Sequence, residues 1–439
     1  MVVTPPPLQP APTPAAPLLP VPSPGEAATQ PAPGAFRSGY DVALLRAAFP
    51  SLLSGTAHFD SPSGTQTPRA VGEAIARTIT GPLSYRGGFG RSEANAEAAV
   101  LRFRKAYAAL LNADPRGIVF GRSATQLTYD FSRHLSLAWG PGDEIVLSRL
   151  EHDANVRPWV QAAKRTGAQV RWIDFDPETA EVNVEAALEL MNDRTRLVAI
   201  TAASNLLGTM PPVAQLAGAA HRAGALVFVD GVHYAAHNLV DVHALGADFF
   251  VCSPYKFLGP HCAVLAADPD TLDGIHPDKL IPSSDEVPER FEYGTLPYEI
   301  LAGATAAVDF LAGIAPGEGT TRREKLQNSW QAIDEHETLV RQWIEEELAM
   351  LPGAVVHSRA QRRTPTLLLT IEGHAMRDAY AFLARRNVLA PAGSFYAYEP
   401  FRRLALADAN ALRIGLAPYT DARDAQRLIE GLRGFLALA

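Results

Sequence analysis

An aspartate and a lysine stand at two points of the chain where short apolar runs end. Asp230 follows the run Ala225 to Val229, and Lys256 comes four residues after Cys252, the end of the run Asp248 to Cys252. Short apolar runs with β-branched residues are typical of strands buried on both faces of a parallel sheet. Because such sheets bind ligands at the carboxyl ends of their strands, we expect both side chains at one site.

This pair of residue types suits a cofactor that carries both an aldehyde and a pyridine ring. A lysine amine forms an imine with an aldehyde, and an aspartate can keep a pyridine nitrogen protonated, as pyridoxal phosphate requires. Each residue alone has a simpler interpretation, Asp230 as a strand-end turn residue and Lys256 as a solvated loop charge. The order and spacing of the two favour pyridoxal phosphate.

The elements around this pair predict an α/β fold. Strand-like and helix-like segments alternate from about residue 115 to residue 266, which is typical of a mainly parallel sheet with right-handed crossovers. One strand is followed directly by Ser123, Ala124 and Thr125 at a helix start. Free N–H groups and the positive end of the helix dipole suit a phosphate there, although a plain capping role is the alternative.

Composition excludes several classes of protein. The chain has 439 residues and a net charge of -8, which argues against nucleic acid or an anionic membrane as partner. No apolar run reaches the roughly 18 residues of a membrane span. The N-terminus lacks the basic and apolar regions of a signal peptide. Only two cysteines, Cys252 and Cys262, are present, so we expect no disulfides and a cytoplasmic location.

The chain divides into three regions. Residues 1–36 are rich in proline and alanine and nearly uncharged, which predicts a disordered or polyproline-like arm. Residues 37–315 contain the alternating pattern and form the predicted large domain. Residues 316–439 begin with a long amphipathic helix and continue as a smaller α+β domain.

Two sequence segments resemble the class V aminotransferase family of fold-type I pyridoxal phosphate enzymes. The segments VDGVH and SPYKFLGPH stand where that family has "VDGAQ" and "S-x-HK-x-x-GP". The resemblance implies a mainly parallel sheet in a large domain, with a smaller C-terminal domain. It makes Lys256 the residue that binds the cofactor aldehyde and Asp230 the partner of the ring nitrogen. It also places His233 and Ser253 beside the cofactor.

Further motifs extend the resemblance over the cofactor site. RLEHDANVRPWV is similar to the family's "EH-x-x-N-x-x-PW", which makes His152 the residue that stacks on the pyridine ring. SNLLG matches "SN-x-x-G", so Asn205 is expected to contact the phenolic oxygen. The turn with Ser123, Ala124 and Thr125 corresponds to the family's phosphate site.

The resemblance also implies substrate and subunit contacts. Arg413, in LRIGLA, matches an arginine that binds the substrate α-carboxylate through a bidentate pair. Arg86, in SYRGGFGRS, stands at the arginine of the family's "HRG" loop and is a second predicted substrate contact. Thr295, in the family's "E-x-GT" segment, is expected to reach the phosphate of the neighbouring subunit, which implies a homodimer. We expect no metal ion.

The chain departs from the nearest branch of the family, the cysteine desulfurases and selenocysteine lyases. Desulfurases carry a nucleophilic cysteine in a C-terminal loop with the pattern "R-x-G-x-HCA". Here the loop reads APAGSFYAYEP, with Pro391 in place of the arginine and Tyr396 in place of the cysteine. By position, neither Cys252 nor Cys262 replaces that thiol. His233 also stands where the family has glutamine.

These features predict a pyridoxal phosphate enzyme that acts on an α-amino acid. Elimination at Cβ of a cysteine-like substrate, the reaction of a C–S lyase, is favoured because it is close to the chemistry of the resembling branch. A true cysteine desulfurase or selenocysteine lyase with an unusual acceptor remains open, as do an aminotransferase, an epimerase and a decarboxylase. A non-catalytic cofactor-binding protein is disfavoured, since no DNA-binding segment accompanies the domain.

Overall fold

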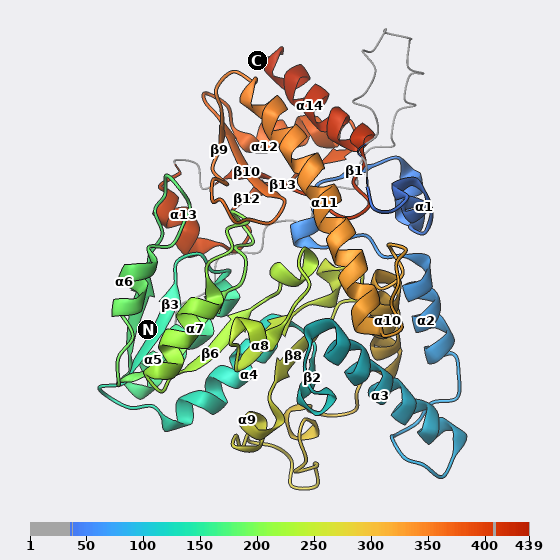
Figure 1. Cartoon of the computed structure of the whole chain (residues 1–439), viewed down its shortest axis with the longest axis vertical. Helices are drawn as coiled ribbons and strands as arrows, with labels where there is room; N and C mark the ends of the chain where they lie inside the picture. The colour runs from blue at the N-terminus through green and yellow to red at the C-terminus, as the bar shows by residue number, and fades with distance from the viewer. Residues whose placement is uncertain (1–35, 37, 407–409, 439) are drawn as a thin grey trace, which may run out of the picture.

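The structure, a computed structural model, describes residue 36, residues 38–406 and residues 410–438. Figure 1 shows a larger part built on one sheet and, above it, a smaller part that contains the C-terminus. All but the last residue of the predicted arm 1–36 lies outside the described residues. Phe36, that last residue, packs edge-on against Trp343, with ring centroids 6.4 Å apart.

A seven-stranded sheet forms the centre of the larger part. Six strands run parallel to one another, and β8 is antiparallel to its neighbours β2 and β7. The predicted mainly parallel sheet is therefore confirmed. In spatial order the strands are β2 (Ile118–Gly121), β8 (Ala263–Ala267), β7 (Phe249–Cys252), β6 (Leu226–Asp230), β5 (Thr195–Thr201), β3 (Glu144–Ser148) and β4 (Gln169–Ile173).

Helices cover both faces of this sheet. In β6, Val227 and Val229 join a core with α3, α7 and α10, while Phe228 joins another with α4 and α5. Successive strand residues point to opposite faces, so a strand covered on both sides is an unbroken apolar run. The helices of this part are α2 (Arg69–Ile79), α3 (Arg91–Leu111), α4 (Ala124–Leu135), α5 (Arg157–Thr166), α6 (Val184–Glu189), α7 (Val213–Arg222), α8 (Val242–Leu245), α9 (Pro269–Asp273) and α10 (Tyr298–Leu311).

An antiparallel four-stranded sheet forms the centre of the smaller part, in the order β12-β13-β10-β9. Leu383 of α12 and Leu428 of α14 pack in its core. Within the described residues, no helix is both long and apolar enough to cross a membrane. The elements are α11 (Arg322–Ala349), β9 (Ala354–Val356), β10 (Thr366–Ile371), α12 (Met376–Ala384), β11 (Val388–Leu389), β12 (Ala392–Gly393), α13 (Tyr398–Leu404), β13 (Ala411–Gly415) and α14 (Ala422–Leu436).

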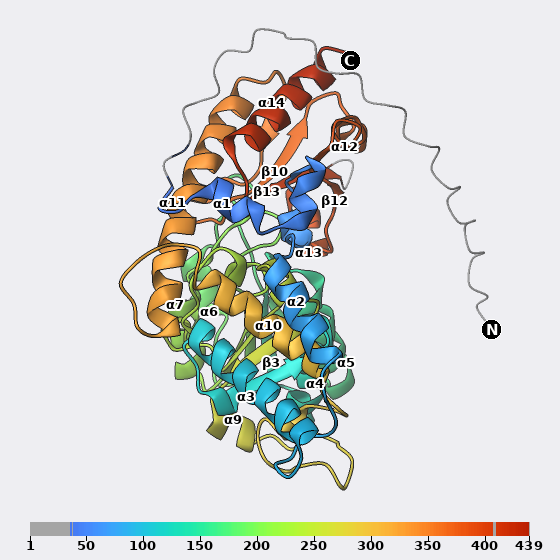
Figure 2. The same cartoon turned by 90° about the vertical axis from the view of Figure 1, so that its right-hand side faces the viewer.

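The N-terminal segment joins the two parts. Figure 2 shows α1 (Val42–Ala47) in the half of the molecule that holds the smaller part. The strand β1 (Ala57–His58) pairs in parallel with β11, and Phe59 lies in the core of the smaller part. The hydroxyl of Tyr40 donates to the carbonyl of Pro418 at 2.7 Å. The domain limits 37–315 and 316–439 remain a prediction. The N-terminal segment, which that prediction assigns to the large domain, also contacts the smaller part.

Candidate active site

Asp230 and Lys256 lie next to each other at one edge of the large sheet. Asp230 is the last residue of β6, and Lys256 ends the 3₁₀ helix Pro254–Lys256 that directly follows β7, the strand paired with β6. Both side chains are buried, with 6% and 7% of the residue surface exposed. Both line a cavity of about 70 Å³, together with Ser123, Ala124, Thr125, His152, Asn205, His233 and Ser253.

Burial disfavours the charged forms of Lys256 and Asp230. Desolvation lowers the pKa of Lys256 to about 8, with a further lowering by Arg413 and an opposing effect of Asp230. Burial raises the pKa of Asp230, while the N–H of Val232, which donates to Oδ1 at 2.9 Å, and Lys256 counteract that rise. The lysine amine is therefore far more easily deprotonated than an exposed one.

The first turn of α4 contributes backbone donors to the cavity. Ser123 is the N-cap, and its side chain accepts from the N–H of Gln126 at 3.1 Å. Ala124 and Thr125 are the first two residues of the helix and line the cavity. The first N–H groups of a helix have no partner within it, and its dipole favours an anion at this end. The turn can therefore hold a phosphate.

His152 is held in one orientation and kept neutral. Its Nδ1 accepts from the N–H of Ala154 at 3.1 Å, so the remaining proton of the neutral ring is on Nε2. Burial, and then the nearby charges of Lys256 and Arg413, lower its pKa to about 3. Its ring stacks on that of Tyr396, with centroids 5.6 Å apart and an angle of 30° between planes.

Two buried polar atoms in the cavity wall have no hydrogen-bond partner among the described residues. These are Oδ1 of Asn205 and Nδ1 of His233. His233 Nε2 lies 3.0 Å from the hydroxyl of Thr364 and 2.9 Å from that of Thr366. Burial holds the pKa of His233 well below its usual range. An unpartnered polar atom in the interior is costly, so both atoms indicate a polar ligand.

Arg413 lines a larger cavity, of about 560 Å³, that shares Lys256 and His152 with the first. Its Nη1 donates to the carbonyl of Asn205 at 2.9 Å, and its Nη2 donates to the hydroxyl of Ser63 at 2.6 Å. Its Nε has no partner in the described part of the chain. Burial lowers its pKa to about 9. A guanidinium fixed in this way can bind a carboxylate.

Arg86 and Thr295 lie outside both cavities. The guanidinium of Arg86 is 2.8 Å from a carboxylate oxygen of Glu97 and 2.8 Å from one of Glu289. Thr295 is exposed in the segment before α10. Within a single chain these two residues are therefore separate from the rest of the predicted site.

The comparison with known proteins decides the family. A model of the family described as aminotransferase class-V matches residues 57–428. The chain belongs to this family.

Relatives of this class-V chain include several cysteine desulfurases. A cysteine desulfurase of Klebsiella pneumoniae is 30% identical over 415 residues, which is 90% of this chain and 98% of that protein. An uncharacterized protein of Mycobacterium tuberculosis, MT3887, is 30% identical over 395 residues, with the same shares of 90% and 98%. The structure of the cysteine desulfurase CsdA from Escherichia coli matches with a TM-score of 0.80 and 26% identity, over 91% of this chain and 99% of that one.

The loop that resembles the desulfurase cysteine loop carries aromatic side chains in this class-V chain. Phe395 and Tyr396 both line the larger cavity, and both have left-handed backbone conformations, with φ of 53° and 56°. Cys252 and Cys262 are buried in the large core instead. Burial raises the pKa of Cys252 well above its usual value and that of Cys262 to about 12. Neither thiol is therefore available as a thiolate.

Glu151 supports the site and was missed by sequence reasoning. Its carboxylate accepts from the hydroxyl of Ser148, the side-chain amide of Asn155 and the N–H of Thr201, at 2.5, 2.8 and 2.7 Å. It therefore ties the ends of β3 and β5 together immediately before His152. Burial raises its pKa to about 8. The glutamate and the asparagine both belong to the EHDAN pattern, so the sequence contained a signal.

The partners of His233 and Arg413 were missed as well. Thr364 and Thr366 come from the segment around the start of β10, in the smaller part, and no sequence pattern connected them with the site. Ser63 lies in the segment TAHFDSPSG and contacts Arg413. That segment combines a strand-like run with a loop of small residues, which was the available signal.

Proposed function

We propose that this protein is a pyridoxal phosphate enzyme that removes a sulfur group from Cβ of an α-amino acid, as a C–S lyase does. The observation that carries the reaction type is the wall of the cavity that Lys256 and Tyr396 both line. Tyr396 occupies the loop position at which the resembling branch has a thiol, and the two cysteines of the chain are buried elsewhere. Without a thiolate beside Lys256, the sulfur leaves as a free product.

The residues present fit the cofactor. The first turn of α4, with Ser123, Ala124 and Thr125, would hold the phosphate, and Ser253 lines the same cavity. The unpartnered Nδ1 of His233 would donate to the phenolic oxygen, and the unpartnered Oδ1 of Asn205, which can only accept, would face that oxygen as the acceptor of its proton. Asp230 would hold the proton of the ring nitrogen, His152 would stack on the ring, and Lys256 would bind the aldehyde carbon. When bound, pyridoxal phosphate supplies a ring that accepts electrons from the substrate Cα.

The chain itself then has two tasks, orientation and proton transfer. Arg413 binds the α-carboxylate, because its guanidinium is fixed by Asn205 and Ser63 and lines the cavity that Lys256 also lines. The amine of Lys256 accepts the proton of Cα, for which its lowered pKa of about 8 is well suited. The bond between Cβ and sulfur breaks, and the proton is returned to the sulfur that leaves.

We further propose a cytoplasmic homodimer, in which Thr295 contacts the phosphate bound by the partner subunit. The exposure of Thr295 in the segment before α10 supports this contact. Arg86 stays a predicted substrate contact, and its position outside the cavities requires a contribution from the partner or a change of its ion pairs. Two unpaired buried thiols are typical of a reducing compartment.

Product analysis tests the proposed function. Purified holoenzyme is incubated with L-cysteine, and sulfide, pyruvate, ammonia and alanine are measured. Elimination with addition of one water gives sulfide, pyruvate and ammonia in equal amounts, and Lys256→Ala should abolish all three. Alanine formed together with a protein-bound persulfide would instead establish a desulfurase, the second candidate, which the names of the relatives favour.

A further inference from the structure

Another cavity, which we call the second cavity, adjoins the cavity of about 560 Å³ that Lys256 and Arg413 line. It measures about 720 Å³ and is lined mainly by aromatic and arginine side chains of α5 and of the segment 394–406. Asp153, Arg157 and Tyr396 line both cavities. The two cavities are therefore adjacent, and these three residues stand where they meet.

The position of this cavity relates it to one part of the substrate. Under the proposed function, on which this inference rests, Arg413 binds the α-carboxylate and Lys256 faces Cα. The substrate side chain must then extend toward a side of the cavity that neither Arg413 nor Lys256 occupies. Asp153, Arg157 and Tyr396 line one such side, and the same three residues line the second cavity.

The lining of the second cavity favours flat, apolar groups. Tyr396 and Tyr398 leave 77% and 52% of their surfaces exposed, and the buried Phe401 also lines the cavity. The guanidinium carbons of Arg157 and Arg402 lie 5.2 and 5.4 Å from the centroid of the Tyr398 ring. Aromatic rings and guanidinium planes both stack on a further ring.

Ion pairs already neutralise the charge of Arg157. Its Nε donates to Asp153 at 2.8 Å, and its Nη2 donates to Glu399 at 3.0 Å. Arg402 lies 4.0 Å from Glu399. Arg157 therefore offers the cavity a stacking surface rather than a free charge.

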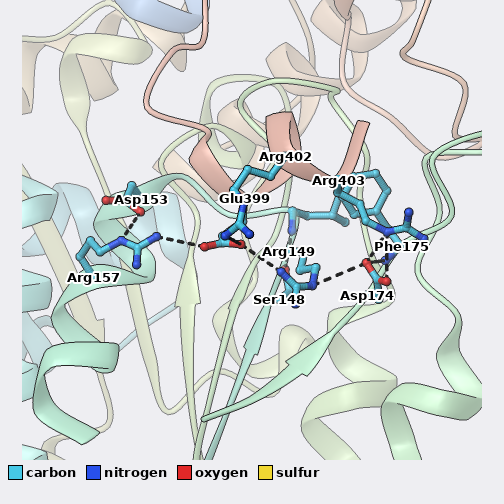
Figure 3. A network of polar contacts seen from close by, with 10 residues as sticks. Ser148, Arg149, Asp153, Arg157, Asp174, Phe175, Glu399, Arg402 and Arg403 are labelled. Carbon is cyan, nitrogen blue, oxygen red and sulfur yellow. Dashed lines mark hydrogen bonds and ion pairs between the residues drawn. The ribbon is translucent and has the colours of Figure 1, made fainter. Parts of the chain in front are cut away.

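Helix α13, which carries part of the lining of the second cavity, is held by ion pairs to the larger part of the molecule. Figure 3 shows Glu399 of α13 between Arg149 and Arg157, and Arg403 of the same helix beside Asp174. Glu399 is buried and accepts from both arginines at 3.0 Å, while Arg403 Nε donates to Asp174 at 2.8 Å. The helix that carries Tyr398 and Phe401 is therefore held in place before any ligand binds.

We propose that the second cavity binds the substrate side chain, and that the substrate is an S-substituted cysteine with an aromatic ring on its sulfur substituent. The left-handed conformation of Phe395 and Tyr396 supports this role, because such a conformation costs energy for a non-glycine residue and is concentrated at ligand sites. Tyr396 lines both the cavity of Lys256 and the site for the ring.

Equilibrium binding to the holoenzyme tests this proposal. Apparent dissociation constants for L-alanine, S-methyl-L-cysteine and S-benzyl-L-cysteine are measured by stopped flow, from the amplitude of the rapid change in the visible spectrum that precedes product formation. S-benzyl-L-cysteine should bind roughly 10-fold more tightly than S-methyl-L-cysteine, because a ring is removed from water. Ser394→Trp, which fills the second cavity, should remove this preference, whereas Ser51→Trp at an exposed position of the 3₁₀ helix Pro50–Ser54 should preserve it.

A second pair of variants keeps the test independent of how Ser394→Trp folds. Tyr398→Ala should weaken binding of S-benzyl-L-cysteine by roughly 3- to 10-fold and leave that of L-alanine unchanged, while Tyr398→Phe retains the ring and the affinity. Equal affinity for the methyl and benzyl compounds, or loss of benzyl binding in Tyr398→Phe, overturns the side-chain site and leaves the proposed function standing. A spectrum that no amino acid changes overturns the proposed function itself.

Discussion

The ring of Tyr396 stacks on the imidazole of His152, with centroids 5.6 Å apart and planes at 30°. The backbone strengthens this contact, because the carbonyl of Tyr396 accepts from the N–H of Asp153 at 2.8 Å. A loop of the smaller part thus holds the residue that we assign to the cofactor ring. The side chain at position 396 thus helps to orient His152.

Tyr396→Ala should weaken retention of pyridoxal phosphate by roughly 2- to 10-fold, since a stacked aromatic pair contributes about 0.5–1.5 kcal/mol. Tyr396→Phe keeps the ring and should behave as the wild type. The dissociation constant of the cofactor is measured by reconstituting the apoprotein and following absorbance. Equal weakening in both variants would mean that the hydroxyl matters, against the stacking argument.

Lys256 should be the single point of covalent attachment of the cofactor. Borohydride reduction of the holoenzyme followed by peptide mapping should find the modified residue at Lys256. Lys256→Ala should lack the visible band and keep the circular dichroism spectrum of the fold. Lys279, which is paired with Asp285 at 2.9 Å and lines neither the cavity of about 70 Å³ nor that of about 560 Å³, serves as control, and Lys279→Ala should retain the band. A tag on any other lysine contradicts the assignment.

The rate at which the apoprotein takes up pyridoxal phosphate should rise with pH and level off above about 8. Only the neutral amine attacks an aldehyde, and burial lowers the pKa of Lys256 to about 8. Arg413→Gln removes a cation and should move the midpoint to higher pH. Asp230→Asn removes an anion and should move it to lower pH. Stopped-flow absorbance measures the profile, and a midpoint near that of an exposed lysine would contradict the prediction.

No persulfide should form on the protein during turnover of L-cysteine. Burial raises the pKa of Cys252 and Cys262, and a protonated buried thiol is a poor nucleophile. Intact-protein mass spectrometry after incubation with cysteine checks for the adduct. Cys252→Ala and Cys262→Ala should release sulfide at rates close to that of the wild type. An added sulfur that disappears in either variant, together with alanine production, would establish desulfurase chemistry.

Thr295→Ala should weaken retention of the cofactor by roughly 1.5–3 kcal/mol, the contribution of a hydrogen bond to a charged group. Thr179→Ala, at another exposed threonine, should have no effect. Sedimentation should show a dimer in both variants, since one hydroxyl is a small part of an interface. A fully active monomer would contradict the proposed contact between subunits.

The local features of the fold were predictable from the sequence. The runs that end at Asp230 and Cys252 are apolar on both faces, and β6 and β7 are buried between two layers of helices. Such a pattern depends only on neighbouring residues, because side-chain direction alternates along a strand. The motifs around His152, Asn205 and Lys256 likewise named side chains that the structure brings to one cavity.

Only the tertiary structure decided which distant side chains meet. Thr364 and Thr366 contact His233, and Glu399 joins Arg149 and Arg157 across the boundary between the two parts. These residues are threonines and a glutamate without periodic or motif signals, and their partners are more than 100 residues away in the chain. A local pattern determines which face of a strand or helix is apolar. The packing of whole elements against one another determines which polar groups must pair when water is excluded.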